Sequence, residues 1–348
     1  MKVSFVSSQA ITQALRYQTS RIQGDLNNAL KEMNTLRVAD TGLALGARTS
    51  VSVSLHREID RLNSLIDSNK LAASRLEMTQ IGLRQLSDAA SDLLADYSTA
   101  LSDTADPAIT RQQAEKTLAL MSSVLNANVN GENIFAGINT DVKPFNDFLD
   151  PTSPNRIAFD TAFQTHFGFA ADAPAAANIT GAQMDAFLTA VESQFLGADW
   201  HGSWSEATDQ QITSRITLTE TAQTSVSANI VGFRKLAMAA ATVVATFSDT
   251  MSKEGRDAIL DRAFKLVGEV IPELANQQGY TGIAEQRLTS ANDRMSMQID
   301  LFTKSIQDLE GIDELNAASR VTGLKTQLEI SYQLTASMQQ LSLLKYLS

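Results

Sequence analysis

Residues 55–101 decide the fold, and they read LHREIDRLNSLIDSNKLAASRLEMTQIGLRQLSDAASDLLADYSTAL. Starting at Leu55, positions separated by alternating steps of four and three residues hold mostly apolar side chains, up to Leu101. This period is that of a coiled-coil seam. At 1.5 Å per residue the predicted helix is about 70 Å long, which exceeds the width of an ordinary globular domain. Asp106-Pro107 ends it, because the residue before a proline disfavours helix.

Polar residues interrupt this seam at a few places. Asn69, Gln80 and Ser87 occupy seam positions. They either fix the register of the packed helices or face solvent where the bundle opens. A shorter antiparallel helix is expected after Pro107, on the stripe Ala114, Leu118, Met121 and Leu125.

The two ends of the chain resemble each other and differ from the middle. Residues 1–106 and 226–348 contain one proline, Pro272. An N-terminal seam stops near Asp40-Thr41-Gly42. Another seam is expected to begin after a turn at 278–282, and a last apolar stripe follows it near the C-terminus. The N-terminal seam consists of Ile11, Leu15, Ile22, Leu26, Ala29, Met33 and Leu36. The last apolar stripe consists of Val321, Leu324, Leu328, Ile330, Leu334, Met338, Leu341 and Leu344.

The middle of the chain has another character. Residues 140–205 hold both tryptophans and most of the prolines and phenylalanines. This composition predicts a small compact domain of short strands and helices. Ile212, Ile216 and Leu218 alternate among threonines, which is typical of a returning strand or hairpin.

These patterns predict a mainly α fold. Long paired terminal helices form a coiled-coil and helical-bundle rod, and a small central α+β or β domain is inserted. Five segments are expected. They are 1–42 and 311–348, the halves of an inner helical domain; 43–138 and 211–310, the parts of a helical-bundle domain; and 139–210, a central outer domain.

Composition excludes several function classes. The formal charge of −11 and the pI near 4.8 argue against nucleic-acid binding, which depends on Lys and Arg. The absence of cysteine excludes disulfides, thiolate catalysis and Cys-ligated metals. The N-terminus lacks the apolar core of a cleaved signal peptide, and no stretch is long and apolar enough to span a membrane. No membrane insertion is expected, and export would use a route without a cleaved signal peptide.

Little in the sequence indicates catalysis or a cofactor. His166 and His201 could share a metal with Asp160, Asp172 or Asp199, but no HxH or HxxxH spacing supports that site. Residues 200–204, Trp-His-Gly-Ser-Trp, suit a carbohydrate or partner patch, and suit a core anchor better. No motif such as Gly-x-Ser-x-Gly surrounds a serine that could act as a nucleophile. We therefore expect no enzyme activity, no cofactor and no metal site.

The terminal helices need partners. A single amphipathic helix in water has nothing to cover its apolar stripe, and ordering its backbone costs about 1 to 2 kcal/mol per residue. Both ends are therefore expected to be mobile in the free monomer and to fold on assembly. The expected assembly interface consists of Ile11, Leu15, Ile22, Leu26, Met33, Leu324, Leu328, Leu334, Met338, Leu341 and Leu344.

Three stretches carry a resemblance to a known family. They are the amphipathic N-terminus, the run Asn-Gly-Glu-Asn-Ile-Phe-Ala-Gly at 130–137, and the ending Leu-Ser-Leu-Leu-Lys-Tyr-Leu at 341–347. In this order they resemble the flagellin superfamily over about 1–140 and 225–348, and within it the hook–filament junction proteins, the family of flagellar hook-associated protein 3. The run 36–42, Leu-Arg-Val-Ala-Asp-Thr-Gly, departs from the family's usual Arg-(Val/Ile)-Asn followed by paired aspartates.

The resemblance implies a structural flagellar subunit. In that family, paired terminal helices line the inside of a tube, a helical bundle lies outside them, and the middle forms an outer domain. The implied partners are the chain itself in a ring, a second hook-associated junction protein or flagellin, and an export chaperone. The implied location is extracellular, at the hook–filament junction, after export by the flagellar type III apparatus. Two alternatives are a flagellin that forms the filament itself and a coiled-coil adaptor unrelated to flagella.

Overall fold

The chain folds into two compact units in a computed structural model that describes residues 8–102 and 106–347. The first unit combines the N-terminal region up to Ser64 with the C-terminal region from Arg294, and the second unit comprises Leu65–Asp293. Two long helices, α3 (Thr49–Leu101) and α9 (Lys253–Glu310), contribute residues to both units.

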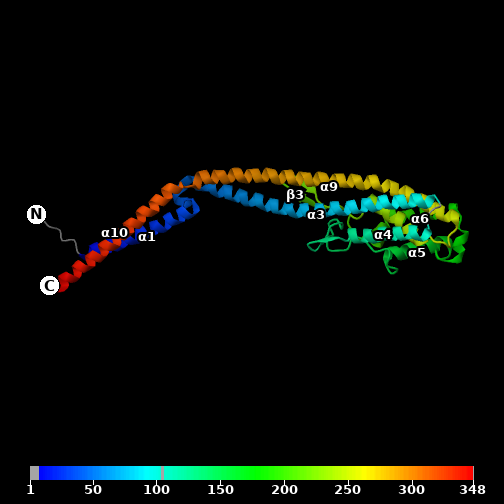
Figure 1. Ribbon diagram of the computed structural model, residues 1–348, viewed down its shortest axis with the longest axis horizontal. Helices are drawn as coiled ribbons and strands as arrows, with labels where there is room; N and C mark the ends of the chain where they lie inside the picture. The colour runs from blue at the N-terminus through cyan, green and yellow to red at the C-terminus, as the bar shows by residue number, and fades with distance from the viewer. Residues whose placement is uncertain (1–7, 103–105, 348) are drawn as a thin grey trace. The chain divides into compact units, whose positions relative to one another are not determined.

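The first unit is built on two paired helices. Helix α1 (Ser8–Thr35) and helix α10 (Glu314–Leu347) lie side by side and run antiparallel (Figure 1). Gln23 Nε2 donates a hydrogen bond to Tyr332 Oη at 2.6 Å, and Arg320 Nη1 lies 3.0 Å from Glu32 Oε2. Between α1 and α3 lie α2 (Thr41–Leu45) and the 3-10 turn η1 (Gly46–Arg48).

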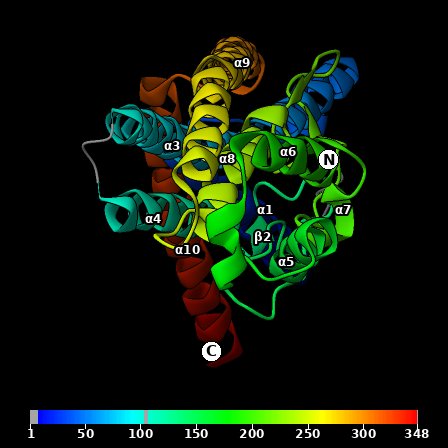
Figure 2. The same cartoon turned by 90° about the vertical axis from the view of Figure 1, so that its right-hand side faces the viewer.

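The second unit is a helical bundle with one continuous core. After α4 (Pro107–Leu125) come β1 (Asn128–Val129), β2 (Glu132–Asn133), α5 (Pro154–Phe167), η2 (Pro174–Asn178), α6 (Gly181–Leu196), α7 (Trp200–Ser203), β3 (Thr213–Arg215), β4 (Thr221–Gln223) and α8 (Val231–Thr246). Helix α8 packs against both α4 and α6 (Figure 2). Its Lys235 Nζ lies 2.6 Å from Glu273 Oε1 of α9, and this hydrogen bond raises the pKa of Lys235.

The mainly helical fold class is confirmed, and so are the main helical stripes of this unit. The predicted α4 stripe is buried, with Ala114, Met121 and Leu125 fully inaccessible. Asn69 is fully buried, and its Nδ2 donates to Ile216 O at 2.9 Å and to Asn292 Oδ1 at 2.8 Å. Gln80 Nε2 donates to Gln278 O at 3.0 Å. Because these amides bridge α3 to α9 and to the β3–β4 hairpin, they fix register as the first of the two readings predicted.

The predicted hairpin is confirmed. Strands β3 and β4 pair antiparallel, with Ser214 opposite Ala222. Its apolar side chains close a small second core with α3 and α9, made of Ala72, Leu76, Ile216, Ala222, Leu288 and Ala291. The hairpin therefore covers part of the α3–α9 seam.

The turn predicted at 278–282 is wrong. Helix α9 continues through this segment, and through Pro272, without a break. A glycine inside a helix costs only about 1 kcal/mol relative to alanine, so the packing of a long apolar stripe outweighs Gly279 and Gly282. Thr281 at this point is buried within the helix, and its Oγ1 donates a hydrogen bond to Gln277 O at 2.9 Å.

The central segment 139–210 contains the helices α5, α6 and α7. The short strands β1 to β4 lie before and after this segment and not within it. Its aromatic side chains belong to the same core as α4 and α8. Trp200 and Trp204 are fully buried and stack with ring centroids 5.7 Å apart. They are core anchors, as expected, and the carbohydrate-patch alternative is wrong. The five-segment division of the chain stays a prediction.

A helix cap at Asp106 gives a first testable prediction. Its Oδ1 accepts a hydrogen bond from Ala108 N at 2.8 Å, one residue before Pro107 starts α4. We expect Asp106→Ala to lower the free energy of unfolding by about 1 kcal/mol, because the first turn loses an acceptor. Urea unfolding measures this loss. Asp88→Ala, at an exposed carboxylate inside α3, is the control, and an equal change in both variants would contradict the capping role.

Candidate assembly surface

The predicted interface residues gather mainly on the seam between α1 and α10 of the same chain. Ile22 is buried, and Leu15, Leu26 and Met33 of α1 are half-buried. Their counterparts on α10, Leu324, Leu328 and Met338, are also half-buried. Leu341 and Leu344 lie outside the residues whose side chains are described. The packing of α1 against α10 in one chain therefore buries part of the apolar seam and leaves the rest accessible to solvent.

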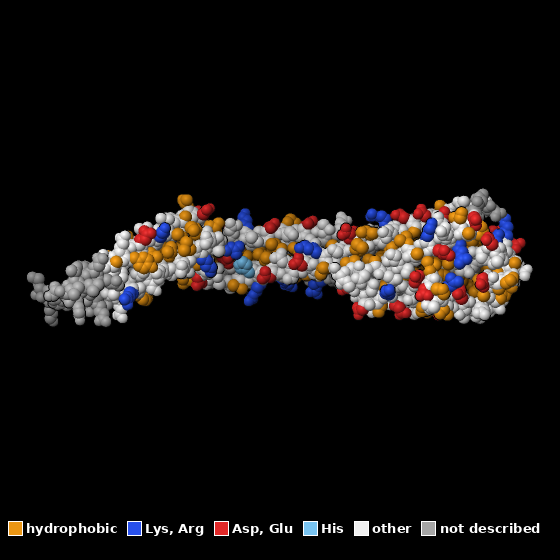
Figure 3. Space-filling view, turned by 60° about the horizontal axis from the view of Figure 1, so that its bottom comes forward, with side chains coloured by type: hydrophobic (Ala, Val, Ile, Leu, Met, Phe, Trp, Pro, Cys, Tyr) orange, Lys and Arg blue, Asp and Glu red, His pale blue; other side chains and the backbone are white. Residues whose placement is uncertain are grey.

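Two of the predicted residues are exposed on this helix pair. Ile11 is 36% exposed and Leu334 is 51% exposed. Near Leu334, Ile330 and Tyr332 are exposed to a similar degree. Isolated apolar side chains are common on protein surfaces, whereas Figure 3 shows apolar side chains gathered over this helix pair. Such a surface can bind other helices by burying apolar area.

Buried carboxylates organise the segment that joins α1 to α3 and α9 to α10, here called the joint (residues 36–48 and 310–315). The Glu310 side chain is 4% exposed and lies at the end of α9. Its carboxylate accepts a hydrogen bond from Ser52 Oγ and lies 3.3 Å from His56 Nε2 and 3.7 Å from Arg37 Nη1. Because these groups come from α3 and from the segment after α1, one carboxylate holds three parts of the chain together.

Glu32 plays a matching role on the other side of the joint. Its Oε1 accepts a hydrogen bond from Ala39 N at 3.2 Å, and its Oε2 pairs with Arg320 of α10. The carboxylate therefore ties the loop after α1 to α10. Sequence reasoning missed both glutamates, because a single glutamate on a helix normally indicates a solvated charge.

Backbone pairing completes the joint. Val38 N donates to Glu310 O at 2.9 Å, and Ile312 N donates to Leu36 O at 3.0 Å. Leu36 adopts a φ of 53°, which is uncommon for a residue with a side chain and costs about 1 kcal/mol or more. The surrounding hydrogen bonds over-determine this conformation, so the joint is a built structure and not a loose linker.

The run at 130–137 is the central anchor of the second unit. Asn130 and Gly131 have φ values of 54° and 91° and form the two-residue turn between β1 and β2. Ile134 and Phe135 are buried in the core. Phe135 O accepts a hydrogen bond from Ala228 N at 2.7 Å. The run is therefore bonded to the segment that leads into α8. Both glycines of this run, Gly131 and Gly137, lie in turns.

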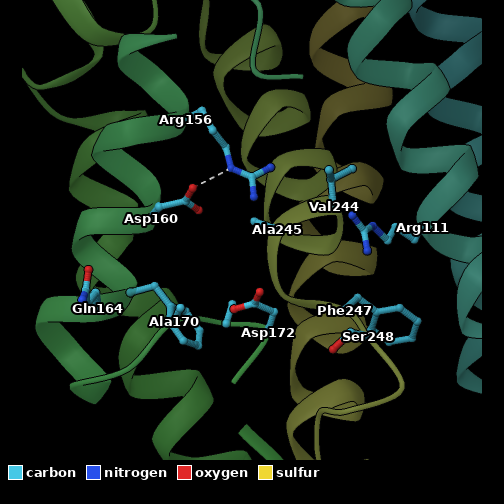
Figure 4. Close-up of a pocket in the computed structure, with 12 residues that line it drawn as sticks. Arg111, Arg156, Asp160, Gln164, Ala170, Asp172, Val244, Ala245, Phe247 and Ser248 are labelled. Carbon is cyan, nitrogen blue, oxygen red and sulfur yellow. Dashed lines mark hydrogen bonds and ion pairs between the residues drawn. The ribbon is translucent and has the colours of Figure 1, made fainter. Parts of the chain in front are cut away.

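A cavity of about 470 Å³ lies between α4, α5 and α8 (Figure 4). Arg156 of α5 reaches into it, and its Nε lies 2.8 Å from Asp160 Oδ2. Arg111 of α4 lies across from them and pairs with Glu115 at 3.2 Å. Each of these two arginines therefore has a carboxylate partner on its own helix.

The histidines considered as metal ligands lie in different surroundings. His166 packs against the rings of Phe167 and Phe187, whereas His201 Nε2 lies 3.6 Å from Asp209 Oδ2. Asp209 also approaches Arg234, whose guanidinium lies over the ring of Trp200. Burial lowers the pKa of Arg234. Among the described residues, no group of three or more His, Asp or Glu is arranged to hold a metal ion.

Comparison with protein families decides what this helical architecture is. The bacterial flagellin N-terminal helical region matches residues 6–140, and the bacterial flagellin C-terminal helical region matches residues 264–347. Together the two matches cover more than half of the chain. The chain belongs to the flagellin superfamily. It is therefore a structural subunit of the bacterial flagellum, an extracellular assembly in which flagellins self-associate.

The flagellin matches coincide with the elements described above. The N-terminal match contains α1, the joint, α3, α4 and the 130–137 run, and the C-terminal match contains most of α9 and α10. The coiled-coil adaptor alternative is not supported. A search of curated proteins finds no match to this flagellin-like chain. Within the described part of the chain, no helix is long and apolar enough to cross a membrane.

Proposed function

We propose that this flagellin-like chain is the hook–filament junction subunit, the role of flagellar hook-associated protein 3. The observation that carries the proposal is the Ile-Phe-Ala-Gly run at 134–137, which resembles the junction family's marker and supports the core of the second unit. The ending Leu-Ser-Leu-Leu-Lys-Tyr-Leu at 341–347 adds support, because it resembles the junction proteins more than filament flagellins.

In this proposal the mechanism is packing. The α1–α10 pair of each copy packs against neighbouring copies and locks them into a ring. The ring contacts a second hook-associated protein on one side and flagellin on the other. The terminal helices become ordered as they pack, because assembly covers the apolar surface that a single chain leaves exposed. An export chaperone covers that surface before secretion through the type III apparatus.

Filament flagellin is the second candidate, since both matched family regions are those of flagellin. A flagellin would use the same helices to form an indefinitely repeating filament. Self-polymerisation of the purified monomer into long filaments would favour this function over the junction role.

Deletion of the gene tests the junction role directly. We expect bare hooks on electron micrographs and flagellin released into the medium, because filament subunits have no junction to build on. Re-expression of the intact chain is the control and should restore filaments. Shortened or altered filaments on intact hooks would identify a flagellin instead, and normal filaments with normal motility would contradict the proposal.

A further inference from the structure

The joint carries three exposed leucines in addition to its buried carboxylates. Leu36 is 43% exposed, Leu43 is 87% exposed and Leu315 is 82% exposed. We call these three residues the joint leucines. Leu36 is the last residue of the predicted N-terminal seam but lies just beyond the end of α1, whereas Leu43 and Leu315 belong to neither predicted stripe. The joint that holds the three is fixed by Glu32, Glu310 and two backbone hydrogen bonds. A rigid surface loses little entropy when it binds, so exposed leucines on it favour association.

The charges near the joint leucines indicate how a partner would bind. Two carboxylates are already used within the chain, because Asp40 accepts from Leu43 N and Asp313 accepts from Asn316 N, each at 2.9 Å. The exposed side chains of Arg48 and Glu314 make no ion pair or hydrogen bond with another described residue. Leu43 lies in α2 and Arg48 ends the following turn η1, and Glu314 directly precedes Leu315. An unused positive charge thus accompanies one leucine, and an unused negative charge accompanies the other.

We propose that the joint is a contact between copies of this chain, in which Leu315 and Glu314 of one copy meet Leu43 and Arg48 of the next. This arrangement pairs apolar with apolar and positive with negative. A symmetric contact between two Leu315 regions would instead bring two Glu314 carboxylates together, which costs free energy. A head-to-tail contact of two different surfaces generates a ring or a helix and not a closed dimer. The inference rests on the proposed function, in which copies of the chain assemble with one another. It adds a second contact between copies, separate from the one made by the α1 and α10 stripes.

Cross-linking between single-cysteine variants tests the contact, because the chain contains no cysteine of its own. Leu43→Cys and Leu315→Cys would be produced together in motile cells, and isolated flagella would be treated with a short bis-maleimide. We expect a covalent dimer from the mixture and little from either variant alone. Leu71→Cys, at a 65% exposed position on α3, replaces Leu43→Cys as the matched control and should give no dimer.

Two results would overturn the contact. One is incorporation of both variants into flagella without any dimer, and the other is a dimer from Leu315→Cys alone as strong as from the mixture. These failures are distinguishable from failure of the junction role. A chain found along the whole filament overturns the junction role while the cross-link persists, whereas an uncross-linked chain at the junction overturns the joint contact.

A charge exchange gives an independent test. Arg48→Glu and Glu314→Arg, each alone, are expected to lower incorporation into flagella about two- to fivefold, the range of an exposed ion pair. The double variant restores the pair in every copy and should recover incorporation. Asp88→Arg is the control for added positive charge far along the chain and should change nothing. Additive losses in the double variant would overturn the proposed pairing.

Discussion

Gly137→Ala is expected to destabilise the second unit by about 2 to 5 kcal/mol, the sum of a backbone cost and an overpacking cost. Gly137 has a φ of 69°, which residues with a side chain adopt at a cost of about 1 to 2 kcal/mol. A Cβ at this position would lie 2.4 Å from Thr208 O and 2.7 Å from Gln210 O. Because these neighbours are backbone atoms, they cannot move aside unless the main chain of Thr208 and Gln210 shifts. Urea unfolding followed by tryptophan fluorescence measures the effect, since Trp200 and Trp204 lie in this core.

Gly131→Ala is the matched control for this prediction. Gly131 also has a positive φ, 91°, but nothing lies within 4 Å of its added Cβ. It should therefore show the backbone cost alone, about 1 to 2 kcal/mol. If both variants lose the same stability, the close approach of 208–210 to Gly137 does not constrain the fold. A larger loss in Gly137→Ala would explain in physical terms why the run at 134–137 ends in glycine.

Sequence reasoning was most successful where one side-chain period persisted over many residues. The stripe from Leu55 to Leu101 predicted α3, and Asp106-Pro107 predicted where α4 begins. Over such lengths the burial of a continuous stripe dominates local preferences, and the period is visible in one sequence. The same dominance explains the failure at 278–282, where local glycines indicated a turn and the longer stripe overrode them.

The central segment could be predicted only in outline. Helices α5 and α6 bury a few large aromatic side chains each, for example Phe159, Phe163 and Phe187, and the ring contacts among them come from different elements. Short elements that pack through scattered aromatics leave no repeating pattern in the sequence. Composition therefore indicated a packed core but could not show that this core is continuous with α4 and α8.

The candidate assembly surface could also be predicted from the sequence only in part. Periodicity indicated the α1 and α10 stripes, but it could not tell which members are covered within one chain, such as Ile22, and which remain exposed, such as Leu334. The joint carries no period at all. Its key groups, Glu32 and Glu310, lie far apart in the sequence and meet different partners, so only tertiary structure shows that they are buried.

Glu310→Ala is the second large expected effect, and it concerns the joint. The variant removes the acceptor of Ser52 Oγ and leaves Arg37 and His56 without their shared carboxylate. A buried hydroxyl without a partner costs about 1 to 3 kcal/mol, whereas Arg37 and His56 are partly exposed and water can solvate them. We therefore expect a local loss of about 2 to 3 kcal/mol and not the larger penalty of two stranded buried charges. Hydrogen exchange measures it, because the amides of Val38 and Ile312 bond across the joint and should exchange faster by a factor of about 30 to 150 for that loss.

Two further variants separate the joint carboxylate from a general effect of mutation on this region. Glu314→Ala removes an exposed carboxylate four residues away that has no bonded partner, and it should leave the Val38 and Ile312 amides protected. Glu310→Gln keeps one oxygen acceptor for Ser52 but loses the charge that faces Arg37 and His56, so an intermediate acceleration is expected. Equal exchange in Glu310→Ala and the unmodified chain would mean that the backbone hydrogen bonds hold the joint without the carboxylate. If Glu310→Ala instead accelerates exchange and also lowers the cross-linking of Leu43→Cys to Leu315→Cys, the carboxylate positions the surface through which copies of the chain meet.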